Sequence, residues 1–183
     1  MEVRDKIMNN NVITSLHIRG ILYEDFVNYK YACLTIAMPY CDFKCNNECG
    51  EQVCQNANIV NGKIYTMDIS TIVTNYLQNR MTKAIVFQGL EPFYQDENKD
   101  SFAEVEAFIN YIRNVKHCND DVIIYTGYTE GECYEKGYIQ RLQAYSNSNI
   151  IIKFGRYQPN QAPHLDPILG VKLASDNQYA KII

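Results

Sequence analysis

Short apolar runs alternate with stretches of helical periodicity along most of the chain. The apolar runs have the length of buried strands and cover residues 32–37, 84–87, 121–125 and 150–154. Apolar residues at helical spacing predict helices between them, which begin after Asp68, after Asp100 or Ser101, and near residue 130. The third helical stretch, over about 130–145, is interrupted at Gly137.

This alternation of continuous apolar strands with helices predicts a mostly parallel sheet joined by helical crossovers. Right-handed crossovers place the carboxyl ends of all the strands at one edge, so the loops that leave them should converge there. A closed eight-stranded barrel needs about 250 residues, and this chain has 183. We therefore expect an α/β fold in the form of an open partial (β/α) barrel, built as a single domain over residues 1–183.

The flanking segments are less regular. Val12 to Tyr23 alternates loosely, so residues 1–30 are expected to form an N-terminal extension or hairpin packed on the domain. Residues 57–67 predict a polar connection with a turn at Asn61-Gly62. The tail is expected to be loop-like, apart from short apolar runs at 168–171 and 179–183.

Composition and charge limit the classes of function. Hydrophobic residues make up 46% and charged residues 21%, which is typical of a soluble domain. A net charge of −4 argues against a nucleic-acid partner. No run approaches the roughly 18 apolar residues of a spanning helix, and the charged start of the chain lacks a signal-peptide core. We therefore expect a cytoplasmic protein with no membrane partner.

Four of the seven cysteines lie in one loop that follows the strand of the first βα unit, at Cys41, Cys45, Cys49 and Cys54. Disulfides rarely persist in the cytosol, and the odd number of cysteines favours metal binding. Zinc sites normally use two paired knuckles, and here no second knuckle follows. An iron–sulfur cluster held by thiolates of this loop suits the spacing better, and three protein ligands would leave one iron open.

The loop and three later segments resemble the radical S-adenosylmethionine superfamily. The similarity lies in the C-x3-C pair, the later Cys-x-Asn and the segment Gly89-Leu90-Glu91-Pro92 after the second strand. Within the superfamily the chain resembles the activating proteins of anaerobic (class III) ribonucleotide reductases. Residues 123–128 look like that family's strand-plus-TGY segment, and residues 175–178 look like its C-terminal Ser-x-Asn-Gln.

The resemblance implies a reaction and its partners. A [4Fe–4S] cluster would bind S-adenosyl-L-methionine at its open iron and cleave it reductively to a 5′-deoxyadenosyl radical. That radical would take a hydrogen atom from a glycine of the large glycyl-radical reductase subunit, which is the protein substrate. An electron donor such as flavodoxin or ferredoxin would reduce the cluster.

The resemblance also implies the site residues. The cluster ligands would be Cys41, Cys45 and Cys54. Glu91 would accept a hydrogen bond from the ammonium of the methionyl part, and Gly89 would let the backbone approach the same group. Placement at the same edge of the sheet, rather than the resemblance, adds the candidates that would shield the cluster or flank the adenosyl part, which are Phe43, Thr126 and Gly127.

The chain departs from the family pattern at two places. The family has C-x3-C-x2-C, whereas here Cys54-Gln55-Asn56 is the better match for the third cysteine, so part of residues 46–53 is an insertion. Cys49 is then either a spare thiol or the true third ligand. At Leu90 the superfamily usually has a second glycine, and its loss removes backbone freedom near the cofactor.

Other functions remain open from the sequence. The chemistry could act on a different protein or peptide, or the domain could be a non-catalytic interaction module stabilised by an Fe–S cluster or zinc. A structural site would use all four cysteines of the loop. In that case Glu91-Pro92 is a polar turn and Thr126-Gly127-Tyr128 is an ordinary strand-to-helix turn. Arg156 either binds a carboxylate or is a solvated surface side chain.

Overall fold

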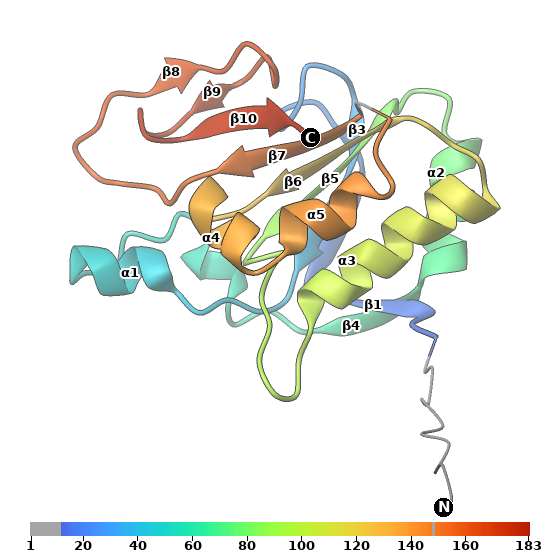
Figure 1. The fold of residues 1–183 in the computed structure, drawn as a ribbon, viewed down its shortest axis with the longest axis horizontal. Coiled ribbons are helices and arrows are strands. Elements are labelled where there is room, and N and C mark those ends of the chain that lie inside the picture. The colour runs from blue at the N-terminus through green and yellow to red at the C-terminus, as the bar shows by residue number, and fades with distance from the viewer. Residues whose placement is uncertain (1–11, 148) are drawn as a thin grey trace, which may run out of the picture.

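A six-stranded sheet runs through the centre of the molecule (Figure 1). The structure is a computed structural model that describes residues 12–147 and 149–183. The strands lie in the order β10-β7-β6-β5-β3-β2. The parallel ones are β3 (Cys33–Met38), β5 (Ala84–Gly89), β6 (Asp121–Tyr125) and β7 (Ile150–Phe154). All four strands predicted from the apolar runs are confirmed.

The edges of the sheet are antiparallel. One edge is β2 (Gly20–Asp25), which pairs with β3, and the other is β10 (Tyr179–Ile182), which pairs with β7. The fold is therefore a mixed α/β fold with a mostly parallel sheet, as predicted. Within the described ranges the sheet does not close into a barrel, because its two outer strands are not paired with each other.

The central strands are mostly apolar because both faces of the sheet are covered. Alternate side chains, such as those of Ile85 and Phe87, join the larger core beneath the helices. Their neighbours, such as Val86 and Ile123, join a smaller core on the opposite face. The continuous apolar runs of the sequence follow from this double burial.

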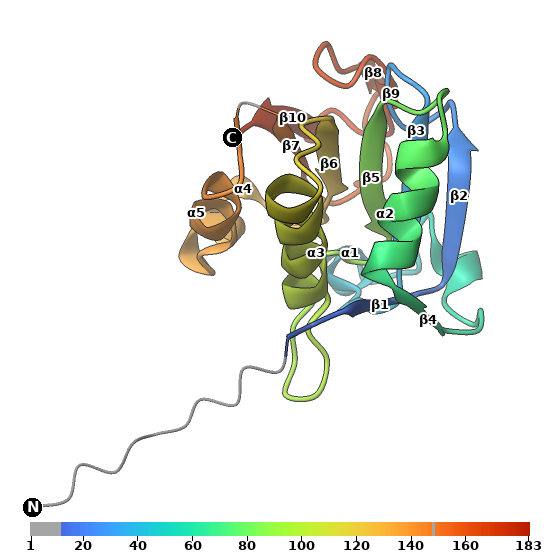
Figure 2. The same cartoon turned by 90° about the vertical axis from the view of Figure 1, so that its right-hand side faces the viewer.

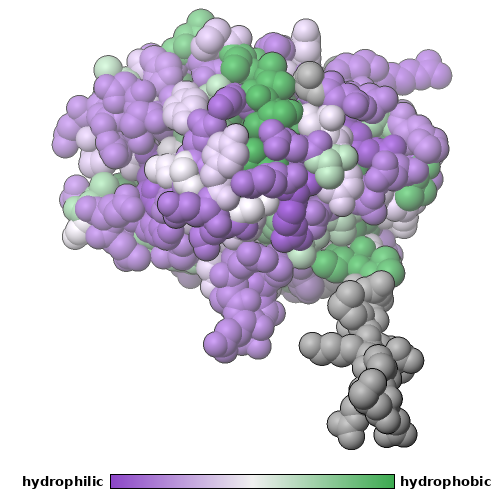
Figure 3. All heavy atoms as spheres, viewed as in Figure 1, coloured by the Kyte–Doolittle hydropathy of each residue, from purple (hydrophilic) through white to green (hydrophobic). Residues whose placement is uncertain are grey.

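The helices cover one face of the sheet (Figure 2). They are α2 (Ile69–Gln78), α3 (Ser101–Asn110) with a π-helical continuation η2 (Tyr111–Val115), α4 (Glu130–Glu135) and α5 (Tyr138–Gln143). Asp100 rather than Ser101 is the N-cap of α3, since its side chain accepts a hydrogen bond from the backbone N–H of Ala103. Gly137, with a φ of 74°, separates α4 from α5. Most of the face shown in Figure 3 is hydrophilic.

The first described residues form two strands that do not pair with each other. β1 (Ser15–Ile18) pairs with β4 (Tyr65–Asp68), and β2 pairs with β3. Residues 12–30 therefore do not form a hairpin of their own, as was considered for residues 1–30. Residues 1–11, which that prediction also covered, lie outside the described residues. The predicted connection over 57–67 contains a short 3-10 helix η1 (Ala57–Ile59) and a turn at Gly62, but it ends in β4.

The C-terminal tail covers the second face of the sheet. It contains the short strands β8 (His164–Leu165) and β9 (Lys172–Leu173), which pair with each other. Leu169 and Leu173 are buried against the sheet together with Tyr29. Asp166 stabilises the tail, since its carboxylate accepts hydrogen bonds from the backbone N–H groups of Ile168, Leu169 and Ala180. No helix of the described chain is long and apolar enough to cross a membrane.

Candidate functional site

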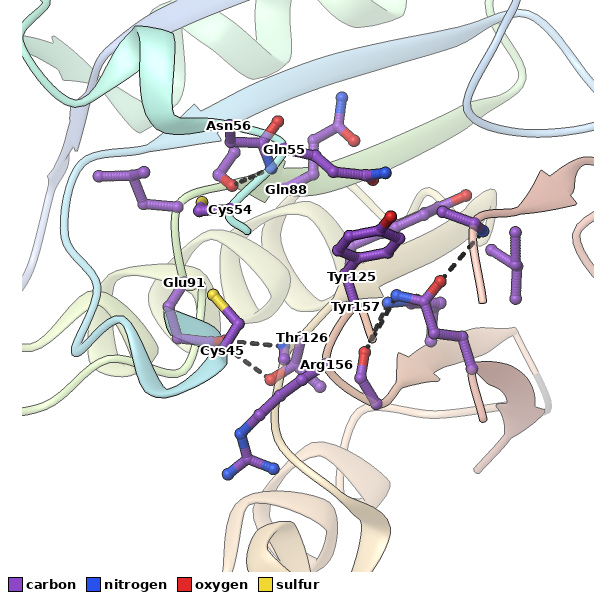
Figure 4. Close-up of a pocket in the computed structure, with 18 of the residues that line it drawn as sticks. Cys45, Cys54, Gln55, Asn56, Gln88, Glu91, Tyr125, Thr126, Arg156 and Tyr157 are labelled. Carbon is purple, nitrogen blue, oxygen red and sulfur yellow. Dashed lines mark hydrogen bonds between the residues drawn. The ribbon is translucent and has the colours of Figure 1, made fainter. Parts of the chain in front are cut away.

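A cavity of about 330 Å³ lies at the carboxyl ends of the parallel strands. Its wall combines the cysteine loop, the ends of β5, β6 and β7, the turn after β2 and part of the tail (Figure 4). The predicted site residues in this wall are Cys41, Cys45, Cys54, Gly89, Glu91, Thr126 and Gly127. The loops expected to converge at one edge of the sheet therefore do so.

The cysteine loop folds into a tight turn and a short helix, α1 (Lys44–Cys49). Phe43, just before α1, has a left-handed backbone with a φ of 52°, which costs roughly 1–2 kcal/mol for a residue other than glycine. In return its N–H lies 3.2 Å from Cys41 Sγ and donates to it. The backbone of Phe43 thus orients Cys41, whereas its side chain is not part of the cavity wall.

Three of the four loop cysteines face the same space. Cys41, Cys45 and Cys54 line the cavity, whereas Cys49 is not among its lining residues. Burial raises the pKa of the Cys41 thiol to about 12. Burial, together with the neighbouring Cys54 thiol, raises the pKa of Cys45 to about 11. Both thiols are therefore protonated at neutral pH in the metal-free protein, and metal binding would release their protons.

This donor set fits an iron–sulfur cluster. Thiolates are the ligands that such clusters use, and the wall offers them at three positions. Among the described residues, no three Cys, His, Asp or Glu side chains are arranged to hold a single metal ion. Ligands of a cluster bind different irons and so need not converge on one point, which suits a cluster better than zinc.

Glu91 is a buried carboxyl group beneath the cysteine loop (Figure 4). Its Oε1 accepts hydrogen bonds from Thr126 Oγ1 at 2.7 Å and from the Phe93 N–H at 3.0 Å. Its Oε2 accepts one from the Gly127 N–H at 2.8 Å. Burial raises the pKa of Glu91 to about 7, although these three hydrogen bonds act in the opposite direction. Glu91 therefore joins the loop after β5 to the loop after β6, which an exposed polar turn would not do.

Close backbone packing explains the glycine at position 89, and Leu90 fits its position without a second glycine. Gly89 has a φ of 95°, and a Cβ there would lie 2.9 Å from the Cα of Ala37 on β3. Its carbonyl oxygen accepts a hydrogen bond from Asn56 Nδ2 at 2.7 Å, which ties the cysteine loop to β5. Leu90 lines the cavity and is not among the residues with positive φ. The missing second glycine therefore causes no backbone strain.

An ion-pair network lies beside the cysteine loop. Arg156, which is only 8% exposed, pairs with Glu132 on α4 and lies 3.3 Å from a carboxylate oxygen of Glu48 on α1. Lys44 Nζ donates to the same Glu132 oxygen over 2.9 Å. Partial burial of Glu132 opposes its charge, but the hydrogen bonds from Arg156, the Thr129 N–H and Lys44 outweigh it and lower its pKa to about 2. Of the two interpretations of Arg156, a solvated side chain is therefore wrong, and in the structure the guanidinium binds carboxylates of the protein itself.

One further part of the wall escaped the sequence analysis. Lys153 on β7 is 7% exposed and donates from Nζ to the Gly155 carbonyl at 2.8 Å, and burial lowers its pKa to about 8. The sequence did contain a signal for this residue, which is a charge inside an otherwise apolar strand. Gln178 also donates to the Gly155 carbonyl, at 3.2 Å, and Asn177 donates to that of Arg156 at 2.9 Å. The C-terminal Ser-x-Asn-Gln segment thus fixes the tail to the end of β7.

Comparison with known families identifies the domain. The model of the family described as 4Fe-4S single cluster domain matches residues 32–178, which is most of the chain. Comparisons with curated proteins and with solved structures find no match. The matched range contains the whole cysteine loop, the four parallel strands and the part of the tail that lines the cavity. The chain therefore belongs to the 4Fe-4S single cluster domain family and is an iron–sulfur protein.

Proposed function

We propose that the protein is a radical S-adenosylmethionine enzyme that installs a glycyl radical on an anaerobic ribonucleotide reductase. The observation that supports this most is that Cys41, Cys45 and Cys54 share one cavity with the buried carboxyl group of Glu91. A purely structural cluster needs thiolates and a closed site. Here the same wall borders a cavity of about 330 Å³, within the roughly 300–1,000 Å³ of small-molecule sites.

In this proposal the three cysteines hold a [4Fe–4S] cluster. When bound, the cluster supplies the electron for reductive cleavage and an open iron for S-adenosyl-L-methionine. Burial of Cys41 and its hydrogen bond from the Phe43 N–H fix one sulfur before the cluster arrives. The Phe43 side chain is assigned the shielding of the cluster from water, because Phe43 lies between the first two cysteines of the loop.

We assign to Glu91 the role of accepting a hydrogen bond from the ammonium group of S-adenosyl-L-methionine. A carboxylate has about four acceptor positions, and protein donors occupy three of them in Glu91. Its Oε2 accepts only one of these bonds and so retains capacity for an ammonium donor. Gly89, Thr126 and Gly127 border the same cavity, which supports their assignment to the methionyl and adenosyl parts.

The partners follow from the proposed reaction. The six-stranded sheet would be the partial barrel of the superfamily, with its carboxyl edge facing a glycine-containing loop of the large reductase subunit. A flavodoxin or ferredoxin would supply electrons, in the cytoplasm. These assignments rest on the family resemblance, and the open cavity supports them because a polypeptide needs access to the cofactor.

Anaerobic reconstitution tests the cofactor chemistry. The full chain should bind about four irons and show a charge-transfer band in the visible range. With dithionite and S-adenosyl-L-methionine it should produce 5′-deoxyadenosine, measured by chromatography. Cys45→Ala should abolish the product, whereas Cys118→Ala, outside the cavity wall, should not. A full complement of iron without 5′-deoxyadenosine would favour a structural cluster domain, and one zinc per chain would contradict the proposal.

The protein substrate needs a separate experiment. The reconstituted protein is incubated with the large subunit of a class III reductase, and the glycyl radical is detected by electron paramagnetic resonance. A radical that depends on both proteins supports the activase function. Formation of 5′-deoxyadenosine without a radical on the reductase would indicate that the enzyme uses the same chemistry on a different protein or peptide.

A further inference from the structure

The loop between the second and third cluster cysteines is long. Eight residues, 46–53, separate Cys45 from Cys54, whereas the family pattern has two. Ordering a residue costs roughly 1–2 kcal/mol of conformational entropy. A cluster ligand at the end of such a loop therefore needs an anchor that holds it near its partner cysteine before the metal binds.

The side chain of Asn46 provides that anchor. Asn46 lies next to Cys45 in the first turn of α1, and its Oδ1 accepts hydrogen bonds from the N–H groups of Val53 and Cys54, both at 3.0 Å. The Cys45 thiol lies 3.7 Å from the same oxygen. One amide oxygen thus contacts both cysteines and closes the eight-residue loop at its base.

The closure separates Cys49 from the cavity. Cys49 is the last residue of α1 and Gly50 ends the helix with a left-handed φ of 71°, so both lie within the closed loop. Beyond the closure, Asn56 donates to the Gly89 carbonyl at 2.7 Å and fixes the chain after Cys54. Cys54 is therefore held from both sides at the cavity wall, whereas Cys49 is not among the lining residues.

We propose that Asn46 is a positioning residue that makes Cys54, rather than Cys49, the third cluster ligand. This inference rests on the ligand set of the proposed function, but it does not depend on cleavage of S-adenosyl-L-methionine. The two 3.0 Å bonds of Asn46 come from backbone N–H groups, so its role requires an acceptor oxygen at this position. Asn46→Ala should lose the role. Asn46→Asp keeps the acceptor but places a negative charge 3.7 Å from the Cys45 sulfur, so it should hold the cluster better than Asn46→Ala and less well than the wild type.

Cluster retention tests the inference directly. Reconstituted full-length variants are challenged with an iron chelator, and the loss of visible absorbance and of iron is followed. Residues that orient metal ligands typically contribute about 10–100-fold to metal affinity, so Asn46→Ala should lose its cluster at least about 10-fold faster than the wild type. Asn46→Asp should lose its cluster more slowly than Asn46→Ala does. Asn47→Ala is the matched control, since Asn47 is exposed and its side chain bonds only to the Asp42 carbonyl, at 3.4 Å.

Three results would overturn the inference. The first is equal cluster retention by Asn46→Ala and the wild type, and the second is an equal loss in Asn46→Ala and Asn47→Ala. The third is a Cys54→Ala variant that keeps its cluster while Cys49→Ala loses it, and this result can be interpreted even if no Asn46 variant folds. A wild-type protein that holds iron but does not cleave S-adenosyl-L-methionine would contradict the proposed function and leave this inference intact.

Discussion

The hydroxyl group of Thr126 donates a hydrogen bond to Glu91 Oε1 over 2.7 Å, in the buried space between the ends of β5 and β6. Thr126→Val keeps the shape of the side chain but removes this donor. A buried carboxyl group that loses a partner should cost about 1–3 kcal/mol of unfolding free energy. Urea unfolding of the metal-free protein measures it. Thr66→Val, at an exposed position of β4, is the control and should change stability little.

Gly89→Ala should destabilise the fold even without any cofactor. The new Cβ would lie 2.9 Å from the Ala37 Cα, in a backbone with a φ of 95°. Strain of this kind costs about 1–3 kcal/mol, and thermal unfolding of the metal-free protein should show it. Gly20→Ala is the matched control, because a Cβ at Gly20 meets nothing within 4 Å. Equal stability of the two variants would mean that β3 and β5 do not approach as closely as described.

Glu132→Gln should loosen α1. Loss of the carboxylate leaves the buried Arg156 without its main partner and frees Lys44, while Glu48 remains near the guanidinium. Mutations that break a partly buried ion pair typically fall within about 0.5–3 kcal/mol. Faster amide hydrogen exchange in residues 44–49 would locate the effect. Lys181→Gln removes an exposed pair with Glu130 and should leave this exchange unchanged.

Asp25 should make stability fall at acidic pH. Burial opposes the charge of its carboxyl group, but hydrogen bonds from Thr35, Asn28 and the Val27 N–H outweigh burial and lower its pKa below the usual value of 3.8. The unfolded state therefore takes up a proton at a higher pH than the folded state does. The stabilisation is complete above the unfolded pKa and is lost as pH falls through the folded one.

Asp25→Asn isolates this contribution. Urea unfolding between pH 7 and pH 3 should find the variant less stable than the wild type at pH 7. The difference should shrink below about pH 4, where the unfolded carboxyl group is protonated. A difference that stays constant over the whole range would show that Asp25 contributes through hydrogen-bond geometry alone.

The main strands and helices could be predicted because burial of their side chains produces a regular pattern of apolar residues in the sequence. Ile85 and Phe87 face one core and Val86 the other, so residues 84–87 of β5 form a continuous apolar run. β4 carries no such period because its side chains are mostly exposed, and it was predicted as part of a connection. Its partner β1 lies far away in sequence, and only the folded chain brings the two together.

The site was predictable where residue type reveals the chemistry. Cysteines in one loop and an acidic residue after a strand are visible in the sequence, and they line one cavity. Asn46 and Glu132 were missed because amide and carboxylate side chains in a polar segment are ordinarily solvated. Asn46 closes its own loop on Cys54, and the irregular loop leaves no periodic signal for that bond. Glu132 binds Arg156, which only the folded chain brings near it.

The cavity wall has a consequence for the order in which the site matures. The wall extends from Val27 to Gln178, and the tail that contributes Val171 to Ala174 is translated after every other part of it. A nascent chain exposes the cysteine loop long before the tail can cover the second face of the sheet. The complete pocket therefore exists only after residue 178 has left the ribosome, and a cluster delivered earlier would meet a binding site that is open on that side.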